Sequence, residues 1–273
     1  MTTIALPRAV ERPVAPSGNR LSWLLQDILT VTWRNLIALT RTPEAVFFSA
    51  VQPIMFVLLF VYVFGGAIHT AVHYVDYLMP GVYVQTVAFG AVSTAVGLSE
   101  DLHKGLIERF RALPMARSAV LAGRTTADLV RNVVVVVIIS VVGFAVGFRI
   151  GTNVGLFLCG ALIILLFSYT LCWGFATLGL SAPNAETAQI MVFPVLFPLT
   201  FASSAFVPVS VMPGWLQAFA KHQPVTQVID AARSLMVGGA VHNTGAVWQA
   251  LAWCFGLLLV LVPLAVRKYR RVA

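Results

Sequence analysis

Long apolar runs divided by short polar breaks are the main pattern in this sequence. The stretches without a charged residue are 45–68, 77–99, 132–148, 150–185, 187–220 and 234–266. A helix needs about 20 apolar residues to cross the hydrocarbon core of a bilayer, and continuous runs indicate helices rather than the alternating strands of a membrane barrel. The pattern predicts six transmembrane helices, at about 45–67, 77–99, 127–149, 155–180, 188–208 and 245–266.

The composition agrees with this prediction. Charged residues make up 10% of the 273-residue chain, hydrophobic residues make up 59%, and the mean hydropathy is +0.89. Soluble domains carry about 25% charged residues, so this composition excludes an ordinary soluble domain. We expect an all-α integral membrane protein that forms one transmembrane domain over residues 21–273.

Most of the positive charge lies on one side of the predicted bundle. Fifteen of the eighteen Lys and Arg residues fall in the N-terminal tail, the connection 100–131 or the C-terminal end, whereas Arg149, Lys221 and Arg233 fall on the other side. Because Lys and Arg accumulate in cytoplasmic loops, both termini and the connection 100–131 are expected in the cytoplasm. The net charge of +8 is then mostly a topology signal, and nucleic acid is not an expected partner.

An amphipathic helix is predicted at 21–40, before the first span. Its apolar side carries Ile28 and several leucines, and its polar side carries Asp27 and Arg34. This pattern is typical of a helix that lies in the membrane interface, either as a simple anchor or as a contact for a partner. Residues 1–20 lack the apolar core of a signal peptide and are predicted to be a disordered cytoplasmic tail.

The connection 100–131 is the one long charged segment. Glu100, Lys104 and Glu108 are four residues apart, a spacing that lets charges support one another on a helix face. The same short helix carries an apolar stripe, formed by Leu106, Ile107, Phe110 and Leu113. The sequence therefore predicts an amphipathic helix that projects into the cytoplasm and ends at Pro114.

Asp128 lies four residues after Arg124 and three before Arg131. This spacing predicts ion pairs that neutralise charge where the chain enters the third span, a solvated charged face being the alternative.

The segment 209–239 is too polar and too broken by prolines to form a simple span. It predicts two short outer helices, at about 213–220 and 224–237, that lie in the outer interface or dip back from it. Asp230 and Arg233, three residues apart, can pair on the side opposite the apolar face of the second helix.

A few polar and aromatic side chains interrupt the spans. A buried amide is costly unless it is hydrogen-bonded, so Gln52 is expected to face another helix or a cavity. The aromatic residues indicate either helix packing or the lining of a hydrophobic path. The candidate path residues are Gln52, Phe56, Phe60, Phe89, Phe193 and Phe197.

The sequence contains no nucleotide-binding loop, zinc-protease motif or nucleophile elbow, and no metal site is predicted. No ionisable residue lies deep in a predicted span, which argues against a transporter that uses carboxylate relays. Energy for uphill transport would therefore come from another chain, through the connection 100–131. The residues predict a six-span membrane subunit docked to a soluble cytoplasmic partner.

Two stretches carry a resemblance to a known family. GLIERFRALPMARSAVLAGR, from Gly105 to Arg124, and SSAFVPVSVMPGWLQAFAKHQPVTQVIDAARSLMVGG, from Ser203 to Gly239, resemble the membrane subunit of type 2 ATP-binding-cassette exporters, especially the daunorubicin-resistance permease family. The resemblance covers nearly the whole chain from Leu21 to Arg271.

The resemblance implies a permease that pairs with a second permease copy or a homologue and binds two cytoplasmic ATPase subunits. ATP and Mg²⁺ are expected in those partners, with no cofactor in this chain. The helix around 106–113 would be the coupling helix, with a contribution from the N-terminal amphipathic helix, and the outer helices would close the path. The residues expected at the ATPase contact are Glu100, Lys104, Leu106, Ile107, Glu108, Arg109, Phe110, Arg111 and Leu113.

On this interpretation the chain is not itself an enzyme. It would export a hydrophobic or amphiphilic compound, such as a drug, lipid or polyketide, across a bacterial cell membrane. One alternative is a glycan exporter, although such exporters usually lack a late stretch like MPGWLQ. The other is a non-transporting membrane scaffold, which would explain the spans and the cytoplasmic charge without a cavity.

Overall fold

The computed structural model describes residues 20–41, 43–68, 70–105 and 117–272. Within these ranges every regular element is a helix. The α-helices are α1 (Arg20–Thr40), α2 (Pro43–Leu59), α3 (Tyr74–Gly90), α4 (Val92–His103), α6 (Arg117–Val146), α7 (Val154–Gly179), α8 (Ala185–Phe201), α9 (Gly214–His222), α10 (Pro224–Met236) and α11 (Thr244–Val272). Short helices of other types are the π-helix η1 (Phe60–Phe64) and the 3-10 helices η2 (Val209–Val211) and η3 (Gly239–Val241).

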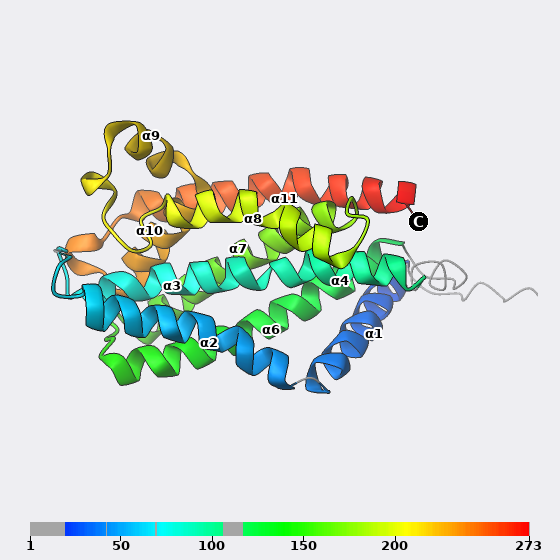
Figure 1. Cartoon of the computed structure of the whole chain (residues 1–273), viewed down its shortest axis with the longest axis horizontal. Coiled ribbons are helices and arrows are strands. Elements are labelled where there is room, and N and C mark those ends of the chain that lie inside the picture. The colour runs from blue at the N-terminus through cyan, green and yellow to red at the C-terminus, as the bar shows by residue number, and fades with distance from the viewer. Residues whose placement is uncertain (1–19, 42, 69, 106–116, 273) are drawn as a thin grey trace, which may run out of the picture.

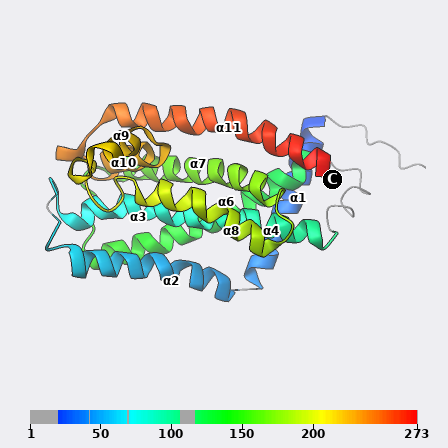
Figure 2. The same ribbon diagram turned by 45° about the horizontal axis from the view of Figure 1, so that its top comes forward.

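The long helices run side by side along an elongated bundle (Figure 1). The helix α11 and the helix α2 lie on opposite sides of the bundle in both views (Figures 1 and 2). One end carries α1 and the C-terminal end of α11, and we call it the α1 end. The opposite end carries α9 and α10, and we call it the α9 end. The two ends of the described chain therefore lie at the same end of the bundle.

Four helical stretches are long and apolar enough to cross a membrane: Tyr74–His103, Ala119–Val146, Val154–Gly179 and Thr244–Arg271. Two shorter apolar helices, Ser49–Phe64 and Ala185–Phe201, lie where the first and fifth spans are predicted. The described helices therefore confirm an all-helical membrane protein. The count of six spans stays a prediction.

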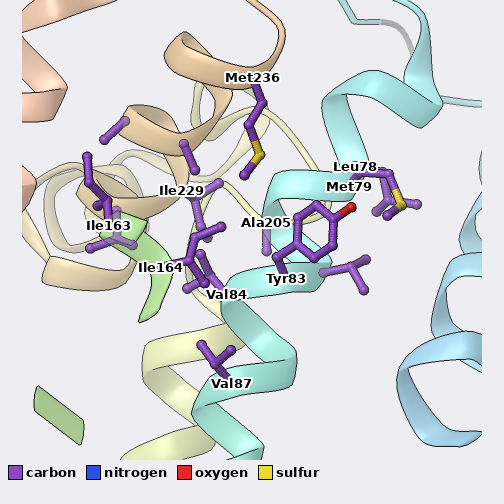
Figure 3. Close-up of a cluster of buried hydrophobic side chains, with 14 of the residues drawn as sticks. Leu78, Met79, Tyr83, Val84, Val87, Ile163, Ile164, Ala205, Ile229 and Met236 are labelled. Carbon is purple, nitrogen blue, oxygen red and sulfur yellow. The ribbon is translucent and has the colours of Figure 1, made fainter. Parts of the chain in front are cut away.

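The stretch Tyr74–His103, which joins α3 and α4 with only a turn at Ala91, is the centre of the bundle. In its most apolar window 78% of the residues are buried, against 17% for Thr244–Arg271. The main core cluster packs Leu78, Met79, Tyr83, Val84 and Val87 of this stretch against α7, α10 and the loop at Ala205 (Figure 3). This stretch is therefore surrounded by other helices, whereas most of Thr244–Arg271 lies at the surface of the bundle.

Local sequence signals explain where several helices begin and end. The side chains of Asn153 and Asn184 accept hydrogen bonds from the backbone N–H groups of Leu156 and Thr187, at 2.8 and 2.7 Å. These are N-terminal caps, which satisfy N–H groups that have no partner within the helix. Gly238 has φ of 66° just after α10, a conformation that favours glycine and turns the chain towards α11.

Candidate functional site

A cavity of ≈ 380 Å³ lies between helices from four regions of the sequence. Its wall is formed by Ser49, Gln52, Pro53 and Phe56 of α2, Gln85, Thr86, Phe89 and Gly90 of α3, Val92 and Ser93 of α4, Arg131, Asn132 and Val135 of α6, and Gln189 and Phe193 of α8. Its volume falls in the range of sites that hold small organic molecules, about 300–1,000 Å³. Four of the six predicted path residues, Gln52, Phe56, Phe89 and Phe193, line this cavity.

The aromatic side chains of the cavity belong to a continuous series of ring contacts. Phe89 meets Phe197 edge to face, with ring centroids 5.8 Å apart, and Phe193 meets Phe197 at 5.5 Å. On the other side Phe56 stacks on Phe60 at 6.0 Å. These distances are typical of favourable aromatic pairs. The two predicted path residues outside the cavity wall, Phe60 and Phe197, are therefore in contact with residues that line it.

Two further phenylalanines join the α2 and α8 sides of this series. Phe56 lies 6.4 Å from Phe201 and 5.9 Å from Phe206. Phe60 lies only 4.4 Å from Phe206. The aromatic surface thus continues from the cavity towards the π-helix η1. Sequence reasoning did not select Phe201 and Phe206, and their contacts depend on how α2 and α8 pack.

Polar groups share the cavity wall with these rings. Gln52 and Gln189 are exposed, whereas Gln85 and Thr86 are buried, with 4% and 8% of their surface exposed. The structure places Gln52 at the cavity rather than in a tight helix contact, which is one of the two positions expected for its amide. The cavity is therefore amphipathic, with rings and carboxamides on facing helices.

A charged network joins α4 to α6 beside the cavity. Asp128 is 4% exposed and accepts hydrogen bonds from the hydroxyls of Thr94 and Ser93, at 2.6 and 3.3 Å. Arg124 Nε and Arg131 Nη1 lie 3.7 and 3.6 Å from its carboxylate oxygens. The predicted position of Asp128 between two arginines is confirmed, and the group is buried rather than solvated.

The network makes further contacts at both of its ends. Towards the α1 end, Arg124 Nη1 lies 3.3 Å from an oxygen of Asp101 on α4. At the cavity, Arg131 donates to the backbone carbonyl of Gly90. Next to it, Asn132 donates to the hydroxyl of Ser168 on α7 at 2.7 Å. A chain of contacts therefore runs from the end of α4 to the cavity wall.

Gly97 makes room for this network. A Cβ added at Gly97 would lie 1.6 Å from Arg124 Nη2, so the guanidinium occupies the space above a residue with no side chain. This is a local reason for the glycine that the sequence alone does not reveal.

The start of the predicted ATPase contact lies at the C-terminal end of α4. Glu100 and Lys104 form an exposed ion pair at 2.9 Å, and the hydrogen bond to Glu100 raises the pKa of Lys104. The remaining predicted contact residues fall outside the described ranges, namely Leu106, Ile107, Glu108, Arg109, Phe110, Arg111 and Leu113. The two described residues are on the surface, where a partner can reach them.

The helix α1 packs against the first half of α6. Val31 and Thr32 are buried, and the Thr32 hydroxyl bonds the carbonyl of Gly123 at 3.2 Å. A Cβ at Gly123 would lie 2.6 Å from that of Val31, so this glycine sets how closely the helices approach. Asp27 and Arg34, the predicted interface residues, are partly exposed.

In addition to the residues that pack against α6, α1 carries an apolar stripe that faces outwards. It consists of Leu25, Leu29, Trp33 and Ile37, each four residues from the next and each exposed. An outward apolar stripe beside membrane spans is typical of a helix whose apolar face enters the bilayer interface.

A second buried charge lies at the α9 end. Arg233 of α10 is 3% exposed, and its Nη1 lies 2.8 Å from Asp230. Its other nitrogens donate to the backbone carbonyls of Tyr77, at 3.1 and 3.2 Å, and Ser204, at 2.9 Å. The guanidinium also lies 3.7 Å from the centre of the Tyr77 ring, an arrangement that favours a cation.

This arrangement corrects one expectation. The Asp230–Arg233 pair is present, but Arg233 is buried against α3 and does not lie on the outer side of α10. Arginine can be buried here because its planar fork satisfies several acceptors at once. The cluster fastens α10 and the loop at Ser204 to α3.

The geometry defines a helical membrane protein with an amphipathic cavity between its helices and a polar network that extends from the cavity towards the α1 end. The sequence pattern of the ABC-2 type transporter family matches residues 26–237. The chain therefore belongs to the ABC-2 type transporter family.

Three relatives show the range of this similarity. The daunorubicin resistance ABC transporter permease protein DrrB1 of Streptomyces coeruleorubidus is 36% identical over 266 residues, which is 95% of this chain and 92% of that protein. The probable doxorubicin resistance ABC transporter permease protein DrrC of Mycobacterium tuberculosis is 28% identical over 93% of this chain and 92% of its own length. The putative transport permease ycf38 of Pyropia yezoensis is 24% identical over 88% and 84%, respectively. The predicted resemblance to a drug-resistance permease is confirmed.

Proposed function

We propose that this chain is the membrane subunit of an ATP-driven exporter of hydrophobic or amphiphilic compounds. The observation that carries the proposal is the cavity, whose wall combines the rings of Phe56, Phe89 and Phe193 with the amides of Gln52 and Gln85. The drug-resistance permeases among its relatives support this class of compound. A scaffold protein has no need of an amphipathic cavity.

In this proposal two permease chains work with two separate ATPase subunits, which hold ATP and Mg²⁺. All six apolar helices cross a bacterial cell membrane, the two short ones included. The α1 end faces the cytoplasm, because α1, the end of α4 and the end of α11 lie there, next to the sequence segments that carry fifteen of the eighteen Lys and Arg residues. The outward apolar stripe of α1 rests in the inner interface, and α9, with Trp215 76% exposed, rests in the outer one.

In this proposal the charged network transmits a movement of the ATPase to the cavity. A movement imposed at Lys104 acts on α4, and α4 is tied to α6 through the Asp101–Arg124 and Thr94–Asp128 contacts. Asp101–Arg124 is an ion pair that is mostly shielded from solvent, and parting such a pair leaves an uncompensated charge. The helices α4 and α6 therefore move together, and Arg131 carries that movement to the cavity wall.

The cluster around Arg233 is proposed to hold helices together rather than to transmit movement. It fastens α10 to α3 at the outer end, beside the aromatic contact of Phe60 with Phe206. For a compound to leave outwards, these contacts must part or shift. In this proposal the cluster keeps the outer end closed until the compound is released.

The first test is affinity purification of the tagged chain from its native host in mild detergent, with ATPase activity measured in the eluate. We expect an ABC ATPase to co-purify with the wild type and to be lost with Glu108→Arg, which reverses a charge in the predicted coupling helix. Glu11→Arg, in the N-terminal tail, is the matched control and should retain the partner. A wild-type eluate without any ATPase would contradict the proposal and favour a scaffold.

A further inference from the structure

The helix α11 lies along one side of the bundle, so one of its faces points away from the other helices (Figures 1 and 2). The exposed apolar side chains of this face are Trp248, Trp253, Phe255, Leu259, Val260 and Leu264. The next exposed residues along the helix are Arg267, Arg270 and Arg271. At 3.6 residues per turn, the three arginines continue the apolar face. We call these three residues the basic end of α11.

Packing fixes the direction in which the basic end points. Lys268 and Tyr269 lie among the arginines but on the other side of the helix. Tyr269 is 2% exposed and belongs to a core cluster that includes Trp173 of α7. Lys268 donates a hydrogen bond to the hydroxyl of Ser181, in the connection between α7 and α8. Because these contacts oppose rotation of the helix, the arginines are held facing away from the bundle.

The guanidinium groups of the basic end have no counter-charge within the described part of the chain. Arg124 and Arg131 pair with Asp128, whereas no ion pair joins the three arginines of the basic end to any described acidic residue. A guanidinium presents a planar fork of donors that matches a phosphate group with two hydrogen bonds. The basic end is therefore able to receive an anionic oxygen group from outside the chain.

The position of the basic end along α11 places it at the depth of lipid headgroups. An α-helix rises 1.5 Å per residue, so Trp248 and Arg267 are about 29 Å apart, close to the thickness of a hydrocarbon core, about 30 Å. Trp248 is 73% exposed, and tryptophan is enriched at the boundary between membrane and water. Leu264, 49% exposed, precedes Arg267 by one turn. A molecule bound here meets arginines with its polar group and an apolar surface with the rest of its length.

Other occupants fit this face less well. A soluble anion would contact the arginines but leave the apolar stretch before them uncovered. A second copy of the chain that packed through α11 about a twofold axis along the bundle would bring the same arginines of both copies together. Such a juxtaposition of like charges costs free energy. An anionic phospholipid satisfies both halves of the face, with its phosphate on the arginines and its acyl chains on the apolar residues.

We propose that Arg267, Arg270 and Arg271 form a binding site for the phosphate of an anionic phospholipid whose acyl chains lie along Leu259 and Leu264. Clusters of basic residues directly beside a membrane span are typical of sites for anionic lipids. The inference goes beyond the proposed export function and does not require it, because the lipid binds to this chain alone. The bound lipid would hold the end of α11 in the register that the contacts of Lys268 and Tyr269 define.

The test measures lipid binding to the purified chain by native mass spectrometry, which counts the lipid molecules that stay bound. The probe is dioleoylphosphatidylglycerol, and the reference is dioleoylphosphatidylcholine, which has the same acyl chains but no net charge. Each Lys or Arg near an anionic lipid surface contributes about fivefold in affinity. We therefore expect the triple variant Arg267→Gln, Arg270→Gln, Arg271→Gln to raise the Kd of the first bound phosphatidylglycerol about hundredfold. Its Kd for phosphatidylcholine should stay the same.

Matched variants separate the site from general effects of charge and folding. Replacing the same three arginines with lysine keeps the charge and should leave the Kd for phosphatidylglycerol within about threefold of the wild type. The single change Arg270→Gln should raise that Kd about fivefold. Its control is Lys221→Gln, which removes one exposed cation from α9 at the opposite end of the bundle and should not change the Kd. These variants test the site even if the triple glutamine variant does not fold.

A photo-reactive amino acid at Leu259, which is 78% exposed, tests what covers the apolar part of the face. We expect it to cross-link to lipid in the membrane and to give no band of two joined permease chains. Such a band would overturn the inference and assign the face to a second copy.

Three binding results would also contradict the inference. Equal affinity of the wild type for the two lipids would show that the arginines do not recognise charge. A triple glutamine variant that binds phosphatidylglycerol as tightly as the wild type would place the lipid elsewhere. Displacement of the lipid by millimolar inorganic phosphate would mean that the site serves a soluble anion. Because no ATP or ATPase is used, none of these results bears on export.

Discussion

The hydroxyl of Thr94 on α4 donates a hydrogen bond of 2.6 Å to the buried carboxylate of Asp128 on α6. This contact joins two helices that flank the segment predicted to meet the ATPase. Asp128 also lies within 3.7 Å of Arg124 and Arg131, the second of which lines the cavity. In the proposed mechanism the network is both a structural clamp and the connection between partner and substrate.

Asp128→Asn should destabilise the protein strongly. The substitution keeps the size of the side chain but leaves Arg124 and Arg131 without their shared carboxylate, and breaking a buried ion pair costs about 3–5 kcal/mol. Chemical unfolding in detergent micelles, followed by circular dichroism, measures the loss. Glu100→Gln is the control, because the exposed pair with Lys104 is worth about 0–1 kcal/mol. Equal losses in the two variants would contradict the role of the network.

Gly179→Ala should force α4 and α7 apart. The added Cβ would lie 2.4 Å from the carbonyl oxygen and 2.8 Å from the Cα of Ala95, which are backbone atoms that cannot turn away. Overpacking of this kind costs about 1–3 kcal/mol, and the Tm of the purified chain should fall. Gly256→Ala on α11 is the control, since no atom lies within 4 Å of its added Cβ. A Tm equal to that of the control would show that the helices do not approach this closely.

Arg233→Lys should loosen the α9 end although it keeps the charge. A lysine cannot reproduce the fork that bonds the carbonyls of Tyr77 and Ser204 and the carboxylate of Asp230. We expect a loss of about 2–4 kcal/mol from the unpaired buried groups and faster hydrogen exchange in α10. Arg270→Lys, at an exposed position near the end of α11, should change neither quantity. Unchanged exchange in α10 would mean that the cluster does not hold this helix in place.

Gly123→Ala should displace α1 from α6. The new methyl group would lie 2.6 Å from the Cβ of Val31, so the helix must shift and lose its bond from Thr32. Trypsin should then cleave more rapidly at Arg41, just after α1, as measured by gel and mass spectrometry. The same assay on Gly256→Ala supplies the reference rate. Cleavage at the reference rate would show that the contact does not position α1.

The apolar runs alone predicted the class of fold, because crossing a bilayer requires long uninterrupted apolar helices. The pairing of Asp128 with Arg124 and Arg131 was also predictable, because residues three or four apart meet on a helix surface. In contrast, the burial of Arg233 was not, since it depends on carbonyls of Tyr77 and Ser204 that are distant in sequence.

The cavity was predictable only in part. The rings of Phe56, Phe89 and Phe193 could be selected as candidates, but so could any aromatic residue that only packs between helices. What separates a lining residue from a packing residue is the spacing of α2, α3, α6 and α8, and no local pattern encodes it.

The most direct test of the central claim is ATP-dependent uptake of daunorubicin into inside-out vesicles that contain the permease and the ATPase that co-purifies with it. The account predicts that the compound accumulates inside when ATP is hydrolysed and does not accumulate with a non-hydrolysable analogue. A complex that hydrolyses ATP without moving the compound, or uptake that is equal without hydrolysis, would contradict it.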